Sequence, residues 1–282
     1  MSHRLHADDL TLRYAERTIS HNLSVSVVDG SFTVIVGPNA CGKSTLLRAL
    51  SRLLPPMAGR VVLDGHDIGA LPAREVARRL ALLPQSSSAP DGIRVADLVG
   101  RGRYPHQSFL RQWSKADEVA VQGAMQATRI TALADRLVDE LSGGQRQRVW
   151  ISMVLAQETD ILLLDEPTTY LDIAHQIELM DLLADLNRQG RTIIAVLHDL
   201  NQACRYATHL VAMRDGAVMA EGQPGEIVTE QLIEDVFGVP SIIIPDPVSG
   251  TPMMVPRGRP ADERPLQASS SCAQDAPLAA EN

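Results

Sequence analysis

The chain has 282 residues, of which 45% are hydrophobic, so it can bury a large core as one large domain or two smaller ones. Its net charge of −8 disfavours a surface for nucleic acid or anionic lipid. No apolar run approaches the roughly 18–20 residues of a membrane-spanning helix, and no apolar signal region opens the chain, so we expect a protein made and kept in the cytosol. The cysteines at 41, 204 and 272 are scattered, which favours free thiols over disulfides or a zinc site.

The first 60 residues predict antiparallel strands, a buried strand and a helix. Apolar and polar residues alternate through much of 10–37, with a turn at Asp29-Gly30 before a buried strand at 32–36. A glycine-rich loop follows that strand. From 44 to 54 the leucines have helical spacing, and we expect Pro55-Pro56 to end this helix.

The rest of the chain predicts a mainly parallel sheet covered by helices, because short apolar runs alternate with helical patterns. The predicted strands lie at 61–63, 79–83, 161–164 and 192–197. The pattern is mostly helical over 95–138, and further helices are predicted at 146–156, 177–186 and 201–206. After Arg257 the composition of proline, serine and charge predicts a disordered tail at 258–282.

The loop after the strand at 32–36 reads GPNACGKS, which fits the phosphate-binding pattern G-x-x-x-x-G-K-[ST] between a strand and a helix. Its main-chain N–H groups and the positive end of the helix can hold phosphate oxygens, Lys43 can neutralise them, and Ser44 can ligate Mg²⁺. The predicted nucleotide-binding residues are Gly37, Pro38, Asn39, Ala40, Cys41, Gly42, Lys43, Ser44 and Thr45.

Two carboxylates, Asp165 and Glu166, end the apolar run ILLLDE, where burial without a partner would cost free energy. A divalent cation and a polarised water would explain both side chains. We therefore expect Asp165 to hold Mg²⁺ through its water shell. We expect Glu166 to take a proton from an attacking water.

A second phosphate-binding element is predicted at LSGGQ, just before a helical run. Ser142 can cap that helix, while Gly143 and Gly144 leave main-chain N–H groups open to an anion. Together with Gln145, this segment resembles the signature of ABC ATPases. The order of the motifs along 5–257 is also similar to that of the family.

This resemblance implies an α/β fold with a P-loop NTPase (RecA-like) core. The core would have a mainly parallel sheet, an N-terminal antiparallel β subdomain and a helical subdomain inserted at about 86–152, all within an ATP-binding domain at 1–257. It also implies that two copies pair head to tail. Residues 142–145 of one copy would then meet ATP held by the lysine-bearing loop of the other copy.

Several residues take a role only through the resemblance. Gln85 resembles the catalytic glutamine that contacts Mg²⁺ and senses the transmembrane partner, and His198 resembles the histidine that contacts the γ-phosphate. Tyr14 resembles the aromatic residue that stacks on adenine, and 170–172 resembles the dimer-contact loop. Ala40 stands where many family members have glycine, and if φ is positive there, alanine would cost about 1 kcal/mol.

Three further segments resemble the ATPases of iron-siderophore importers: GRGRYPHQ at 100–107, HDLNQA at 198–203 and DPVSGTP at 246–252. The expected function is ATP hydrolysis that drives ferric-siderophore uptake, at the cytoplasmic face of the inner membrane. The expected partners are permease subunits, a second copy of the chain and, indirectly, a periplasmic or lipid-anchored substrate-binding protein, with no nucleic acid. Cobalamin and haem importers share much of this pattern and remain alternatives.

Two other classes are less consistent with the sequence. A soluble ABC ATPase acting on nucleic acid or ribosomes has tandem cassettes or a long coiled-coil insertion, whereas this chain has one cassette and no sustained heptads. A regulatory cassette that only binds nucleotide would be expected to lose the carboxylate at 166 or the histidine at 198, and both are present.

Overall fold

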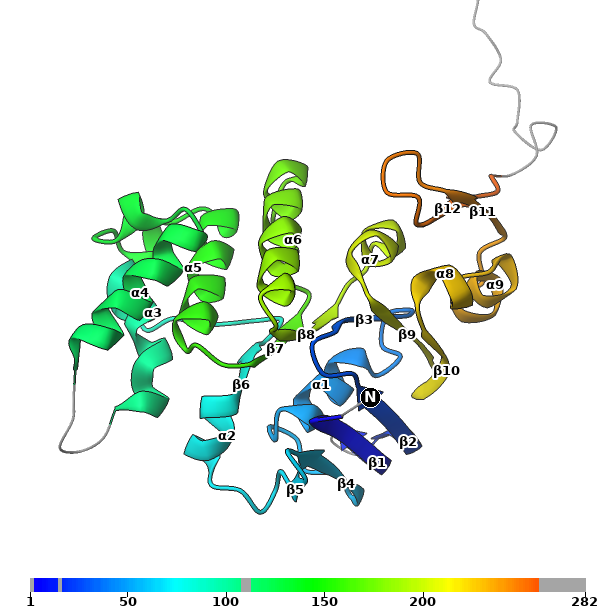
Figure 1. Ribbon diagram of the computed structural model, residues 1–282, viewed down its shortest axis with the longest axis horizontal. Coiled ribbons are helices and arrows are strands. Elements are labelled where there is room, and N and C mark those ends of the chain that lie inside the picture. Colours follow the sequence, from blue (N-terminus) through cyan, green and yellow to red (C-terminus); the bar gives the residue numbers. More distant parts are fainter. Residues whose placement is uncertain (1–2, 15–16, 108–112, 259–282) are drawn as a thin grey trace, which may run out of the picture.

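The computed structural model describes residues 3–14, 17–107 and 113–258 of the chain. The tail predicted to be disordered, 258–282, lies outside the described residues except for Gly258. None of the described helices is both long and apolar enough to cross a membrane. The protein combines a central six-stranded sheet, a smaller antiparallel sheet below it and helices on both sides (Figure 1).

The central sheet has the strand order β10-β9-β3-β8-β7-β6 and is parallel except for β10. Every residue of β3, β7 and β8 is buried, as expected for a parallel sheet covered on both faces. The strands are β3 (Phe32–Val36), β6 (Leu80–Leu83), β7 (Ile161–Asp165), β8 (Thr192–Val196), β9 (His209–Arg214) and β10 (Ala217–Gly222). The sequence therefore predicted the three central strands to within one residue.

The two faces of this sheet belong to different hydrophobic clusters, because side chains alternate along a strand. Val34 of β3 and Leu164 of β7 pack with the helices on one face. Ile35 and Leu163 pack on the other face, against α1 (Lys43–Leu50) and the N-terminal sheet. Helix α1 is thus held between two sheets (Figure 1).

The N-terminal sheet is antiparallel, with the order β2-β1-β4-β5. Alternate residues of its central strand β1, including Leu5, Ala7 and Leu12, are buried against α1 and β3. The strands are β1 (Leu5–Tyr14), β2 (Arg17–Val27), β4 (Ala58–Leu63) and β5 (His66–Asp67). This arrangement brings the β1–β2 end of the small sheet close to the loop that follows β3.

Helix α1 ends four residues earlier than the sequence predicts. Its leucines through Leu50 are buried, but Leu53 is exposed. The chain leaves the helix at Arg52, whose φ is +66°, and two hydrogen bonds close the end: Leu53 N–H donates to Arg48 O (2.9 Å) and Arg52 N–H to Ala49 O (3.0 Å). This is a Schellman motif. The prediction was wrong because glycine usually marks this motif, and here an arginine adopts the left-handed conformation.

Helix α2 (Ala73–Arg79) was not predicted from the sequence. It includes Arg79, so β6 starts at Leu80, one residue later than the predicted strand. Between β6 and β7 the described chain consists of helices joined by loops, and its only extended pairing is one isolated bridge, Arg94–Leu137. The helices are α3 (Val95–Gly100), η1 (Arg101–His106), α4 (Lys115–Ala127), η2 (Thr131–Leu133), η3 (Val138–Glu140) and α5 (Gly143–Ala156), where η marks 3₁₀-helices. They form the group at the left of Figure 1.

The C-terminal part of the described chain covers the other end of the sheet. Helices α6 (Ile173–Arg188) and α7 (Leu200–Tyr206) lie above it, followed by α8 (Pro224–Ile227) and α9 (Glu230–Phe237) (Figure 1). The last elements form an antiparallel hairpin, β11 (Ser241–Pro245) and β12 (Pro252–Pro256), whose second strand packs on α7. Strand, loop, helix and parallel sheet together make the P-loop NTPase fold that the sequence predicts.

Candidate active site

The parallel sheet explains why distant residues meet at one edge. Strands β3, β6, β7 and β8 all point the same way, so the segments that follow them emerge at the same edge. The glycine-rich loop follows β3, and Gln85 follows β6. Asp165 ends β7 with Glu166 next to it, and His198 lies two residues after β8.

The glycine-rich loop depends on left-handed backbone at two of its glycines. Gly37 has φ +154°, and a Cβ there would lie 2.2 Å from the carbonyl oxygen of Met213. Gly42 has φ +105° and directly precedes α1, whose N-terminus no side chain caps. The first-turn N–H groups of α1 are therefore available to an anion. Ala40 has φ +61°, which confirms that this position needs positive φ.

Lys43 is buried and bonded to its own loop. Its Nζ donates to Gly37 O (2.9 Å) and Pro38 O (2.8 Å). These bonds hold the loop closed around the ammonium group. Cys41 lies in the hydrophobic core, where burial raises the pKa of its thiol, so this thiol is protonated and inert at neutral pH.

Asp165 is almost fully buried, at 2% exposure, and accepts a hydrogen bond from Ser44 Oγ at 2.8 Å. Burial raises the pKa of this carboxyl, and the neighbouring charge of Glu166 raises it further, against the opposing effect of the Ser44 hydrogen bond. A buried carboxylate with a raised pKa is stabilised by a nearby cation. The hydroxyl and the carboxylate are both hard oxygen donors of the kind that Mg²⁺ prefers.

Glu166 and His198 contact each other: Nε2 of His198 lies 2.7 Å from Oε1 of Glu166. The second carboxylate oxygen, Oε2, accepts a bond from Thr169 Oγ1 at 3.3 Å. The Glu166 side chain is only 11% exposed, whereas that of His198 is 49% exposed. The backbone at Glu166 is also left-handed, with φ +53°.

A cleft of about 480 Å³ connects these residues. It is lined by Tyr14, Arg17, Ile19, Asn39, Ala40, Gly42, Lys43, Ser44, Thr45, Arg48, Gln85, Glu166 and His198. Ten of these thirteen were predicted site residues. Gly37, Pro38, Cys41 and Asp165 do not line the cleft, but they belong to its loop or contact Ser44 or Lys43.

Sequence reasoning missed Arg17, Ile19 and Arg48. The guanidinium carbon of Arg48 lies 5.9 Å from the centre of the Tyr14 ring, a cation–π contact between two residues of the cleft lining. One signal was present in the sequence, because Arg48 lies four residues after Ser44 and therefore on the same face of the helix. Arg17 and Ile19 gave no such signal, since only the folding of the small sheet brings β2 to the cleft.

Residues 142–145 lie outside this cleft. Ser142 caps α5, with its Oγ accepting from Gln145 N–H (3.3 Å) while Gln145 Oε1 accepts from Ser142 N–H (3.2 Å). Ser142 and Gly143 are exposed, and none of the four residues lines the cleft. A Cβ added to Gly144 would lie 3.5 Å from Leu171, so this tip sits beside the loop that follows Glu166.

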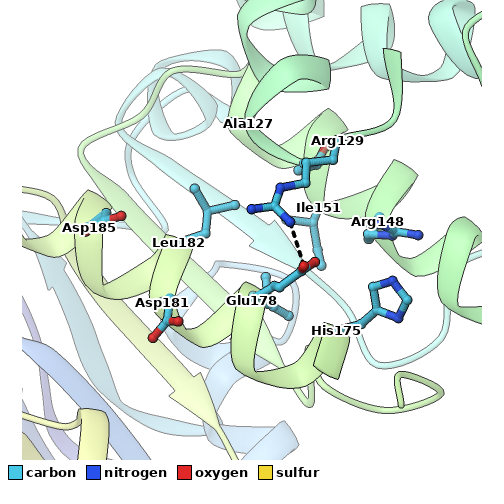
Figure 2. Close-up of a pocket in the computed structure, with 11 residues that line it drawn as sticks. Ala127, Arg129, Arg148, Ile151, His175, Glu178, Asp181, Leu182 and Asp185 are labelled. Atoms are coloured by element: carbon cyan, nitrogen blue, oxygen red, sulfur yellow. Dashed lines mark hydrogen bonds and ion pairs between the residues drawn. The ribbon is translucent and has the colours of Figure 1, made fainter. Parts of the chain in front are cut away.

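A second cavity, of about 260 Å³, lies between helices α5 and α6 and the C-terminal end of α4 (Figure 2). It contains charged groups, but some of them already have partners inside or beside the cavity. Arg129 Nη1 lies 2.5 Å from Glu178 Oε1, and Asp181 accepts a bond from Tyr206 Oη at 2.9 Å. None of the predicted site residues lines this cavity, so the site remains the cleft at the sheet edge.

The fold and the cleft define a P-loop NTPase: a glycine-rich loop and lysine lie between β3 and α1, and two acidic residues lie at the carboxyl end of β7, which β8 separates from β3 in the sheet. More narrowly, the chain belongs to the ABC transporter family, whose model matches residues 20–169. As a member of this family it is an ATPase.

Known proteins resemble nearly the whole described chain. It is 60% identical over 259 residues to the "Ferric enterobactin transport ATP-binding protein FepC" of Escherichia coli (strain K12), covering 92% of this chain and 96% of that one. It is 55% identical over 253 residues to the "Probable siderophore transport system ATP-binding protein YusV" of Bacillus subtilis (strain 168), with 89% and 92% covered. A solved metal-chelate type ABC transporter in an inward-facing conformation matches with a TM-score of 0.77 and 28% identity, covering 92% of this chain and 98% of that one.

Proposed function

We propose that this chain is the ATP-hydrolysing subunit of an importer that takes up ferric siderophores. The proposal rests mainly on its 60% identity, along almost its full length, with a ferric enterobactin transport protein. The segments at 100–107, 198–203 and 246–252 point to the same kind of importer. ATP hydrolysis in the cleft would supply the free energy for transport.

In this proposal the cleft binds ATP with its phosphates at the glycine-rich loop. Lys43 exchanges its carbonyl partners for phosphate oxygens, and the N–H groups at the start of α1 complete the phosphate site. The adenine stacks on Tyr14, with the Arg48 guanidinium over the same ring. The positions of Lys43, Thr45 and Tyr14 along the lining of one cleft support this orientation.

Mg²⁺ would be held by Ser44, Asp165 and Gln85, and would neutralise phosphate charge when bound. The buried Asp165, with its raised pKa, fits such a cation. Among the described residues, no group of three or more His, Cys, Asp or Glu side chains is arranged to hold a metal alone. A cation held by Ser44, Asp165 and Gln85 would complete its coordination with phosphate oxygens of the nucleotide and with water.

Glu166 would act as the general base. As the water oxygen attacks the γ-phosphorus, one water proton passes to the Glu166 carboxylate, and the bond to the ADP oxygen breaks. His198 lies 2.7 Å from Glu166 and lines the same cleft, so in this proposal it holds the carboxylate and contacts the γ-phosphate. Gln85, exposed after β6, lies on the same side.

We further propose that hydrolysis requires two copies arranged head to tail. The tip formed by Ser142, Gly143, Gly144 and Gln145 has exposed glycine backbone yet is not part of the cleft of its own chain, which supports a role at the other copy's nucleotide. Glu166→Gln should trap this dimer with ATP, as measured by size-exclusion chromatography with light scattering. A variant that binds ATP and remains monomeric would contradict the arrangement.

The proposed permease surface is the helical segment of about 86–152. It carries a groove of about 820 Å³ in which Tyr104 and Trp113 are 60% and 54% exposed, an unusual exposure for aromatic side chains. Docking there would hold the chain at the cytoplasmic face of the inner membrane. A substrate-binding protein would act on the permease from the other side, without touching this chain.

The test is uptake by cells that lack this gene. Deletion should abolish uptake of ⁵⁵Fe-labelled enterobactin or a related chelate, and the intact gene should restore it, whereas the Lys43→Ala variant should not. Uptake of haem and cobalamin should be unchanged, because separate importers would carry them. Loss of haem or cobalamin uptake with normal siderophore uptake would overturn the proposed substrate but not the ATPase assignment.

A further inference from the structure

The loop from Glu166 to Leu171 is held in a costly conformation. Both Glu166 (φ +53°) and Tyr170 (φ +67°) have left-handed backbone, which is unfavourable for residues other than glycine. Such a conformation persists only where surrounding groups determine it. The contacts that hold this loop therefore also hold the carboxylate of Glu166.

A single amide, that of Gln176 in α6, joins two carbonyls of this loop. Its Nε2 donates to Leu171 O at 3.0 Å and to Thr168 O at 3.4 Å. A main-chain carbonyl can only accept, so the NH₂ group of Gln176 must face the loop and its oxygen must face away. On that far side, Gln202 Nε2 of α7 donates to Gln176 Oε1 at 3.0 Å.

Helix α7 is in turn fixed to the C-terminal hairpin at both of its ends. In its first turn, Asn201 Nδ2 donates to Met254 O (3.2 Å), and Met254 N–H donates to Asn201 Oδ1 (2.8 Å). In its last turn, Arg205 forms an ion pair with Asp246 at 2.8 Å. Figure 1 shows α7 lying between α6 and this hairpin.

These contacts connect the segments that carry Glu166 and His198, the two residues proposed to act in hydrolysis. Glu166 starts the loop that Gln176 holds, and His198 lies two residues before α7, which carries Gln202. Asp199 joins His198 to α7, because its Oδ1 accepts from the N–H groups of Asn201 and Gln202. A shift of α7 relative to α6 would therefore change the 2.7 Å contact between His198 and Glu166.

We propose that Gln176 and Gln202 are positioning residues for ATP hydrolysis. Through this pair of amides, α7, anchored by the hairpin β11–β12, fixes the loop after Glu166 and so the place of the carboxylate opposite His198. The proposal rests on the roles proposed above for Glu166 and His198. Neither glutamine is among the residues that line the cleft, so both act through the loop rather than on ATP.

The test uses Gln176→Met, Gln202→Met and the double variant of the full-length chain. Methionine keeps the length of the side chain but removes the amide. A misplacement of about 1 Å can cost up to 10²-fold in rate, so we expect kcat for ATP to fall about tenfold or more. KM for ATP and the melting temperature should stay close to wild type. Since both act through one link, the double variant should be no slower than Gln176→Met alone.

Two further variants serve as controls. Gln231→Met removes a glutamine amide from the exposed face of α9, where it bonds to Asp235 of the same helix, and should leave kcat unchanged. Gln202→Glu keeps size and polarity, but its carboxylate would oppose Oε1 of Gln176, so it should reproduce the loss of kcat seen with Gln202→Met. This second substitution keeps the test informative if a methionine variant folds poorly.

Wild-type kcat in Gln176→Met and Gln202→Met would overturn the positioning role. So would a loss of rate that merely follows a lower melting temperature, or additive losses in the double variant. Glu166→Gln and His198→Ala are measured alongside. If these two variants retain hydrolysis, the proposed catalytic roles fail. If they lose it while the glutamine variants do not, only the positioning inference fails.

Discussion

Nε2 of His198 lies 2.7 Å from Oε1 of Glu166, although 32 positions separate the two residues in the sequence. They meet because β7 and β8 are adjacent and parallel, so their carboxyl ends lie side by side. The imidazole is the more exposed of the two side chains, and both residues line the cleft. In the function proposed above, both residues would act at a terminal phosphate and its attacking water.

Replacing Glu166 with Gln should reduce ATP hydrolysis by about 10² to 10⁴-fold, the usual contribution of a general base. The amide keeps the shape of the side chain but cannot take a proton from water. The affinity for ATP, measured with a fluorescent analogue, should change less than about threefold, because the substitution removes a proton acceptor and not a binding contact. Retained hydrolysis would show that another group accepts the proton.

Replacing Lys43 with Met should weaken ATP binding by about 10- to 100-fold, because hydrogen bonds to a charged group contribute about 1.5–3 kcal/mol each. Isothermal titration with ATP and Mg²⁺ measures this. The chain's other lysine, Lys115, is exposed at the start of α4 and lies outside the cleft, so Lys115→Met is a matched control. Equal losses in both variants would argue against a specific role for Lys43.

Replacing Tyr14 with Ala should weaken ATP binding by roughly 5- to 100-fold, since stacking of a base on an aromatic ring contributes about 1–3 kcal/mol. Tyr14→Phe keeps the ring and should bind like wild type. The loss should be smaller for a triphosphate that lacks a base, such as inorganic tripolyphosphate. If Tyr14→Ala weakens the binding of tripolyphosphate equally, the ring does not stack on adenine.

Replacing Asp165 with Asn should stabilise the nucleotide-free protein at neutral pH. Burial raises the pKa of this carboxyl above its unfolded value of about 3.9, so the folded state disfavours the charged form. The contribution of Asp165 to stability is thus fully present below about pH 3.9 and is lost as pH rises through the folded pKa. The melting temperature of Asp165→Asn should exceed that of wild type at pH 7–8, and the gap should shrink toward pH 4.

Asp172 provides a control of opposite sign for this experiment. Hydrogen bonds from the backbone and side chain of His175 lower the pKa of its carboxyl. It therefore stabilises the fold above its unfolded pKa and stops doing so as pH falls through the lower folded value. Asp172→Asn should lower the melting temperature at pH 7–8 and lose this effect in acid. The same sign for both variants would contradict the electrostatic explanation.

Replacing Ala40 with Gly should increase the free energy of unfolding by about 0.5–1 kcal/mol. The alanine has φ +61°, where a Cβ costs about 1–2 kcal/mol, and the greater entropy of unfolded glycine offsets part of the gain. Urea denaturation of the nucleotide-free protein measures this change in the free energy of unfolding. Ala174→Gly, at an exposed position in α6, should instead lower stability by about 0.5–1 kcal/mol.

Sequence patterns predicted the parts of the site that are local in the chain. The strand at 32–36, its glycine-rich loop and the acidic end of β7 are each encoded by adjacent residues, and the structure contains all three. The alternation of apolar runs and helical patterns also predicted the mainly parallel sheet. Roles for single residues such as Gln85 and His198 came only from the family resemblance, because one glutamine or histidine has many structural uses.

What the sequence did not predict depends on distance in space or on unusual backbone. Arg17 reaches the cleft only because β2 folds back along β1, and Arg52 ends α1 in a conformation normally taken by glycine. Gln176 of α6 and Gln202 of α7 contact each other, although β8 separates the two helices in the sequence. No local pattern of residues distinguishes such side chains from ordinary surface glutamines and arginines.

The ammonium group of Lys43 donates to two carbonyls of its own loop, so an anion bound there would compete with both for the same donors. A lone orthophosphate ion can offer oxygens to the lysine but cannot also span the helix start and reach Tyr14. A triphosphate can do all of this at once. We therefore expect orthophosphate, one of the two products of ATP hydrolysis, to inhibit the enzyme only weakly as it accumulates.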